Sequence, residues 1–222
     1  MLPRASIIGS IGRSYRACFS SSRFLLASVI SIGILVLGVT LDVYANVYAT
    51  ERASNPVTDI VLSNVPVFDV DGLFVYGTFA FVVFVLFVWL LRPQWLPFSA
   101  ASLGLFFLIR TCFVSLTHVG PFPDHVVLDV GTLMAKVIGG NDLFFSGHTG
   151  APFLLALVFW QTPLLRWVFL GTSIAFATIV LLGHLHYSID VAAAYFITYT
   201  IFCIAGHLFE RYREFFYDTQ KL

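Results

Sequence analysis

Charged residues are scarce in this sequence of 222 residues, where 12 Lys and Arg and 12 Asp and Glu make up 11% of the chain. Ordinary soluble domains contain about 25% charged residues, and 59% of this chain is apolar, so the composition excludes an ordinary soluble domain. The formal net charge is zero and no basic block follows the N-terminal segment, so nucleic acid is not an expected partner. The three cysteines, Cys18, Cys112 and Cys203, lie far apart without metal-ligand spacing, so neither a disulfide framework nor a metal site is predicted.

Long apolar runs fill the chain instead. The hydrocarbon core of a bilayer needs roughly 20 apolar residues per spanning helix. Charged residues divide the chain into six runs of about this length, which are 24–41, 72–91, 93–117, 143–165, 167–183 and 191–209. We therefore predict an all-α, polytopic membrane protein with six transmembrane helices in a single membrane domain over residues 24–209, between an N-terminal segment 1–23 and a tail 210–222.

The distribution of arginine predicts the orientation of these spans. Four arginines precede the first span with no acidic residue among them, which predicts a cytoplasmic N-terminus. With six spans, the C-terminal tail falls on the same side, and most acidic residues fall in the opposite loops. An organelle transit peptide in the first 23 residues is the alternative. Residues 42–71 are expected to leave the membrane, with a short interfacial helix at 56–62, and no chemistry is assigned to them.

A histidine and an aspartate lie where the fifth span turns into the sixth. Ionisable groups at membrane depth cost about 2.5–3.5 kcal/mol, so they are functional candidates. His186 and Asp190 are four residues apart and share a face if the segment is helical. The carboxylate would then accept a hydrogen bond from one imidazole nitrogen and leave the other free to attack. A buried pair that only stiffens the helix junction is the alternative.

A second polar cluster precedes the fourth span. Ser146, Gly147 and His148 are expected at a helix N-terminus, where free N–H groups attract phosphate, and His148 would protonate a leaving oxygen. The alternative is that Ser146 is a plain N-cap and His148 reaches the membrane interface. Arg110 lies about 10 Å inside the third span, counting 1.5 Å per residue. Its anionic partner is a substrate phosphate, Asp190 or another carboxylate, and these options stay open.

These residues resemble the motifs of the membrane-embedded lipid phosphate phosphatase (PAP2-type) superfamily and, within it, of the sphingomyelin synthase-related branch. The matching motifs are Asp142-x3-Ser146-Gly147-His148-Thr149 and His186-Tyr187-Ser188-x-Asp190, followed by Tyr195. The resemblance implies a phosphohistidine mechanism without metal or cofactor, at a site on the exoplasmic, periplasmic or lumenal face. It implies that His186 attacks phosphorus, that Asp190 orients it, and that His148 serves first as acid and then as base. The residues expected to bind substrate are Arg110, Asp142, Ser146, Gly147, Thr149 and Tyr195.

One departure from the phosphatase branch bears on the substrate. Ile179-Val180 stands where that branch carries a second Ser-Arg pair, so an arginine clamp for a phosphate monoester is missing. The leading interpretation is an enzyme that moves a phospho-headgroup from a membrane phospholipid to a lipid alcohol such as ceramide or diacylglycerol. A lipid phosphate phosphatase with water as acceptor, and a non-catalytic lipid-binding membrane protein, are the alternatives. His118 and His184 are expected to be interfacial histidines rather than catalytic ones.

Overall fold

The computed structural model describes residues 12, 14–126 and 144–217, and within these ranges the chain is helical with connecting loops and no strand. The elements are α2 (Ser22–Glu51), η1 (Leu62–Asn64), α3 (Asp71–Leu91), η2 (Pro93–Trp95), α4 (Leu96–Leu116), α6 (Gly147–Val158), α7 (Pro163–Leu182), α8 (Ser188–Leu208) and α9 (Glu210–Tyr217). Five helical segments of the described chain are long and apolar enough to cross a membrane, namely α2, α3, η2 with α4, α7 and α8. The prediction of an all-helical integral membrane protein is confirmed.

The predicted fourth span, 143–165, differs from the structure in its length. Its helix α6 has 12 residues, which at 1.5 Å per residue measure about 18 Å, whereas the bilayer core is about 30 Å thick. The chain turns after α6, where the Thr162 N–H donates to the Phe159 carbonyl at 2.8 Å, and Pro163 then opens α7. Proline suits this first helical position because its missing N–H would have no partner there. Among the described residues, five helical segments are long enough to span a membrane and α6 is a shorter apolar helix, so a sixth full span is not shown.

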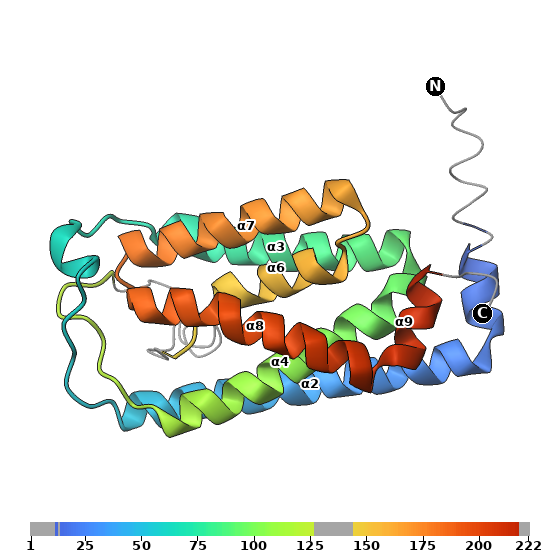
Figure 1. Ribbon diagram of the computed structural model, residues 1–222, viewed down its shortest axis with the longest axis horizontal. Coiled ribbons are helices and arrows are strands. Elements are labelled where there is room, and N and C mark those ends of the chain that lie inside the picture. Colours follow the sequence, from blue (N-terminus) through green and yellow to red (C-terminus); the bar gives the residue numbers. More distant parts are fainter. Residues whose placement is uncertain (1–11, 13, 127–143, 218–222) are drawn as a thin grey trace.

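Helix α6 lies inside the bundle, where it packs against α4, α7 and α8 (Figure 1). Nine of its 12 residues are buried. The long helices instead expose large apolar side chains, such as Val29 on α2 and Leu73 and Leu90 on α3. Lipid tails are as apolar as leucine, so these exposed side chains form the lipid-facing surface. The short helix is therefore shielded from lipid by its neighbours and begins inside the bundle.

Two glycines allow α2 and α4 to pack closely. A Cβ atom on Gly38 would lie 2.6 Å from the Gly104 carbonyl oxygen, and a Cβ atom on Gly104 would lie 2.7 Å from the backbone carbon of Ile34. Both distances are too short for real side chains, so these helices meet backbone to backbone. Membrane helices commonly use small residues for such contacts.

Helix α2 also extends beyond its predicted end at residue 41. It continues to Glu51 and includes Asp42, which is buried against α4. The predicted span ends before Asp42 because a lone carboxylate is costly at membrane depth. In the structure, Asp42 pairs with Arg110 of α4, which offsets that cost. The polar segment predicted at 42–71 therefore begins only after Glu51. The short helix predicted at 56–62 is instead the 3-10 turn Leu62–Asn64.

Both described ends of the chain lie at the same end of the bundle (Figure 1). Cys18, Phe24 and Ala27 form an apolar cluster with Phe215 of α9. Loops 52–70 and 117–126 lie at the opposite end, together with the turn between α7 and α8 (Figure 1). The candidate catalytic residues are at this second end.

Candidate active site

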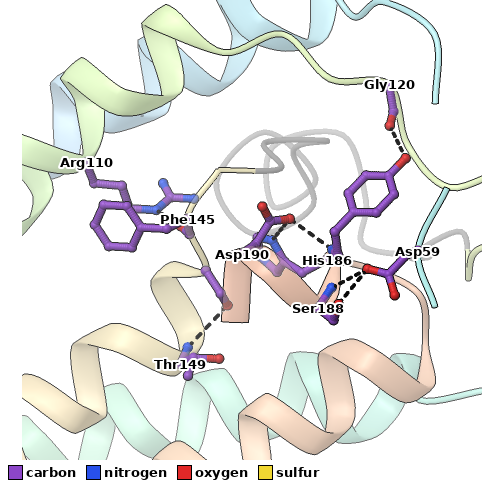
Figure 2. A network of polar contacts seen from close by, with 10 residues as sticks. Asp59, Arg110, Gly120, Phe145, Thr149, His186, Ser188 and Asp190 are labelled. Atoms are coloured by element: carbon purple, nitrogen blue, oxygen red, sulfur yellow. Dashed lines mark hydrogen bonds and ion pairs between the residues drawn. The ribbon is translucent and has the colours of Figure 1, made fainter. Parts of the chain in front are cut away.

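The two polar motifs, about 40 residues apart in the sequence, are neighbours in the structure. The Ser146 N–H donates to the Asp190 carbonyl oxygen at 3.3 Å, which joins the start of α6 to the start of α8. Arg110 of α4 reaches the same region, where its Nε donates to the Phe145 carbonyl just before α6. Figure 2 shows Phe145 beside Arg110, and Asp190 next to His186. Residues from α4, α6 and α8 thus meet in one polar cluster.

His186 and Asp190 form a buried pair at the N-terminus of α8, with exposed fractions of 4% and 2%. His186 Nδ1 lies 3.6 Å from Asp190 Oδ2, which is within ion-pair range but longer than a hydrogen bond. The same oxygen accepts the Tyr187 N–H at 2.9 Å, because Asp190 is the third residue of the helix and reaches back to its start. The geometry therefore differs from the predicted hydrogen bond, since Nδ1 of His186 faces the carboxylate without one.

Ser146 is the N-cap of α6, as the sequence interpretation allowed. Its backbone is extended, and its Oγ accepts the Thr149 N–H at 3.4 Å. The N–H groups at the start of a helix lack intrahelical partners and carry the positive end of the helix dipole. Thr149 is fully buried, and its Oγ1 has no hydrogen-bond partner among the described residues. The start of α6, which the Ser146 N–H joins to Asp190, therefore contains one buried hydroxyl without a partner among the described residues.

The His148 ring packs between aromatic side chains of two other helices. Its centroid lies 4.4 Å from that of Phe74 on α3 and 5.7 Å from that of Phe176 on α7. The side chain is half-buried. His148 is thus held within the bundle, which differs from the alternative that it reaches out to the interface.

Arg110 is buried and paired with a carboxylate. Its Nη1 lies 2.8 Å and 2.6 Å from the two carboxylate oxygens of Asp42, and its Nε donates to the Phe145 carbonyl at 3.0 Å. A Cβ atom on Gly147 would lie 3.0 Å from the same Nε, so the guanidinium rests against the start of α6. Of the partners that the sequence left open, the structure shows a carboxylate, and it comes from α2. The signal for it was present, because Asp42 is the one acidic residue between positions 24 and 50.

Tyr195 and Thr149 are linked through Ser173 of α7, a residue that the sequence analysis did not select. The Ser173 Oγ donates to the Thr149 carbonyl at 2.8 Å and lies 3.3 Å from the Tyr195 hydroxyl. Asp142 lies outside the described residues. Within the described part of the chain, no group of three His, Cys, Asp or Glu side chains could hold a metal ion.

His184 holds two loops beside the site. It is 3% exposed, with a left-handed φ of 53°. Its Nδ1 lies 2.7 Å from the Asp124 carbonyl oxygen and its Nε2 lies 3.1 Å from that of Val65. The ring is buried because both nitrogens find partners on loops that are distant in the sequence. His118, in contrast, is half-buried with its ring against Tyr48, at a centroid distance of 5.3 Å.

Comparisons with known proteins bear on the same region. Residues 139–208 match the family model described as PAP2 superfamily C-terminal. No curated protein and no solved structure matches the chain. The matched segment includes both histidine motifs and helices α6, α7 and α8. The match supports the PAP2-type superfamily and, with it, a membrane enzyme of the phosphatase or phosphotransferase kind.

Proposed function

We propose that this protein is a lipid phosphotransferase that moves a phospho-headgroup from a membrane phospholipid to a lipid alcohol such as ceramide or diacylglycerol. The observation that carries the proposal is the junction between the starts of α6 and α8, where the Ser146 N–H meets the Asp190 carbonyl. The junction supports the proposal, in which His186 is the nucleophile, Asp190 is its carboxylate partner, and the start of α6 with His148 completes the site. Nucleophilic catalysis of phosphoryl transfer needs these groups.

In the first half of the proposed reaction, Nε2 of His186 attacks the phosphorus of the donor. The bond between phosphorus and the lipid oxygen breaks, and protonated His148 gives its proton to that oxygen. Asp190 stabilises the positive charge that develops on His186, because its carboxylate lies 3.6 Å from Nδ1. The N–H groups at the start of α6 receive the phosphoryl oxygens.

In the second half, His148 is neutral and takes the proton from the hydroxyl group of the acceptor. The acceptor oxygen attacks phosphorus, and the bond between phosphorus and Nε2 of His186 breaks. His186 returns to its starting state and His148 is again protonated. A lipid alcohol as acceptor makes the protein a transferase.

The charge balance of the cluster favours a phosphodiester donor. Asp42 neutralises Arg110 through two contacts to Nη1, and Ile179 and Val180 add no charge on α7. A phosphate monoester carries a charge of about −1.5 to −2 at pH 7, and the Asp190 carboxylate would repel it. A phosphodiester carries a single negative charge and is repelled less.

The proposed orientation places the site on the exoplasmic, periplasmic or lumenal side. The described chain ends share one end of the bundle, and the arginines of the N-terminal segment favour the cytoplasm for that end. The cluster around His186 lies toward the other end (Figure 1).

The test of the proposed function is a lipid analysis of purified protein in phosphatidylcholine vesicles that contain fluorescent ceramide and fluorescent diacylglycerol. Wild type is expected to give a fluorescent lipid with a new headgroup, and His186→Ala to give none. His207→Ala is the matched control, because His207 is an exposed histidine of α8. Equal products from wild type and His186→Ala would contradict the proposal. In vesicles that also contain phosphatidic acid, a phosphate monoester, release of free phosphate with no new phospholipid would instead identify a phosphatase.

A further inference from the structure

The loop between α2 and α3, residues 52–70, contacts the segment that carries His186. Asp59 of this loop is 7% exposed. Its Oδ2 accepts the Ser188 N–H at 2.7 Å and the Ser188 hydroxyl at 2.8 Å, as Figure 2 shows. Its Oδ1 accepts the N–H groups of Val61 and Leu62 at 2.8 Å and 3.1 Å. One carboxylate oxygen thus binds the start of α8, and the other binds the loop itself.

Ser188 is the first residue of α8 and lies two residues after His186 and two before Asp190. The first N–H groups of a helix have no intrahelical partner, and a nearby side-chain oxygen commonly accepts from one of them. Here the oxygen comes from a residue 129 positions away in the sequence. The negative charge of Asp59 also suits the positive end of the α8 dipole.

Tyr187 adds a second attachment at the neighbouring position. Its hydroxyl donates to the Gly120 carbonyl at 2.8 Å and accepts the Val57 N–H at 3.2 Å. Its ring is 2% exposed and packs with Leu62 of the same loop. The two residues that directly follow His186 are therefore both fixed to loop 52–70.

We propose that Asp59 is a positioning residue for the reaction: by holding Ser188, it sets the placement of the His186 ring relative to Asp190 and to the start of α6. Its four hydrogen bonds go to Ser188 and to its own loop, so it acts through α8 and does not touch the substrate. The predicted effect on catalysis rests on the proposed function, whereas the predicted effect on the start of α8 does not. Without the hydrogen bonds between Asp59 and Ser188, the start of α8 shifts, and Nε2 of His186 is no longer aligned for attack on phosphorus.

The kinetic test uses purified protein in lipid nanodiscs that contain diacylglycerol as the acceptor, with p-nitrophenyl phosphorylcholine, a chromogenic phosphodiester, as the donor. A misplacement of about 1 Å costs up to about a hundredfold in rate, so we expect Asp59→Ala to lower kcat by about tenfold or more. KM should change little, because the groups that bind substrate are untouched. Asp59→Asn keeps one acceptor oxygen for Ser188, so its kcat should lie between those of Asp59→Ala and wild type. Asp69→Ala, which removes an exposed carboxylate of the same loop, should match wild type.

A second measurement does not depend on activity. Hydrogen exchange of residues 183–191 should be faster in Asp59→Ala than in wild type and in Asp69→Ala, with exchange in α4 unchanged. Should Asp59→Ala fail to fold, Ser188→Ala removes one of the two bonds from the other side and should raise exchange to a smaller extent.

Two results would overturn the inference: unchanged exchange of residues 183–191 in Asp59→Ala, or faster exchange with an unchanged kcat, whether or not KM shifts. Turnover of the probe by His186→Ala at the wild-type rate would overturn the proposed function. In that case the exchange measurement still decides whether Asp59 holds the start of α8.

Discussion

At the scale of single residues, the two histidines of the cluster have different surroundings and, in the proposed reaction, different tasks. His186 faces the Asp190 carboxylate, as suits a ring that becomes positively charged on attack. His148 has aromatic rings of Phe74 and Phe176 beside it, and its proposed task is to move a proton. A proton donor is needed only when the leaving group is a poor one.

This difference predicts how the His148→Ala variant responds to the leaving group. With a phospholipid donor, loss of the general acid should lower the rate by about 10²- to 10⁴-fold. With p-nitrophenyl phosphorylcholine, the leaving group departs without a proton, so the initial burst of p-nitrophenolate should persist. His186→Ala should show no burst with p-nitrophenyl phosphorylcholine and no headgroup transfer from a phospholipid. Loss of the burst in His148→Ala would contradict its assignment as the acid, and stopped-flow absorbance measures it.

At the scale of elements, one ion pair joins three helices around the site. Arg110 of α4 contacts Asp42 of α2, and its Nε binds the peptide that leads into α6. Both side chains of the ion pair are buried. A buried pair contributes little over an apolar replacement, but the loss of one partner leaves an uncompensated charge.

Asp42→Ala is therefore expected to destabilise the protein by about 3–5 kcal/mol. The double variant Asp42→Ala with Arg110→Met should recover part of this loss, because it leaves no charge behind. Thermal unfolding in detergent measures both, with Asp69→Ala as the exposed carboxylate control. Equal stability of Asp42→Ala and wild type would show that the pair does not hold the three helices.

The contact between loop 52–70 and α8 has a predicted pH dependence. Burial raises the pKa of Asp59, but the hydrogen bonds from Ser188, Leu62 and Val61 lower it more, and the net pKa is below the ordinary 3.8. A carboxyl group with a lowered pKa stabilises the folded state at pH values above its unfolded pKa, and this contribution disappears as the pH falls through the folded pKa. The exchange protection of residues 183–191 should therefore be constant from pH 7 to about 4 and fall below that. In Asp59→Ala this acid-dependent loss of protection should be absent. If the loss persists in that variant, another titratable group causes it.

At the scale of the whole molecule, the sequence predicts those features that depend on the local pattern of apolar and polar residues. The long apolar runs predicted the helices, and the polar motifs at their ends predicted the candidate site around His148 and His186. The short length of α6 was hidden because residues 159–162 contain no charged residue that would end a span, although the chain turns there.

The contacts that join distant segments were not predictable in this way. Asp42 and Arg110 are 68 positions apart, and Asp59 and Ser188 are 129 apart. No periodicity or local spacing encodes such pairs, since they depend on how the helices pack. The sequence did require a partner for Arg110, because a buried guanidinium is costly alone. It contained no comparable requirement for Asp59, which lies in a loop that could equally have been solvated.

The central claim is that His186 carries the headgroup between donor and acceptor. The most direct test is to mix the wild-type protein in nanodiscs with p-nitrophenyl phosphorylcholine, without an acceptor, and to quench in alkali. Mass spectrometry of the peptide that contains His186 should then find one phosphorylcholine group on that histidine, and added diacylglycerol or ceramide should remove it. A wild-type protein that turns over the substrate without any adduct on His186, or with the adduct on another residue, would contradict the account.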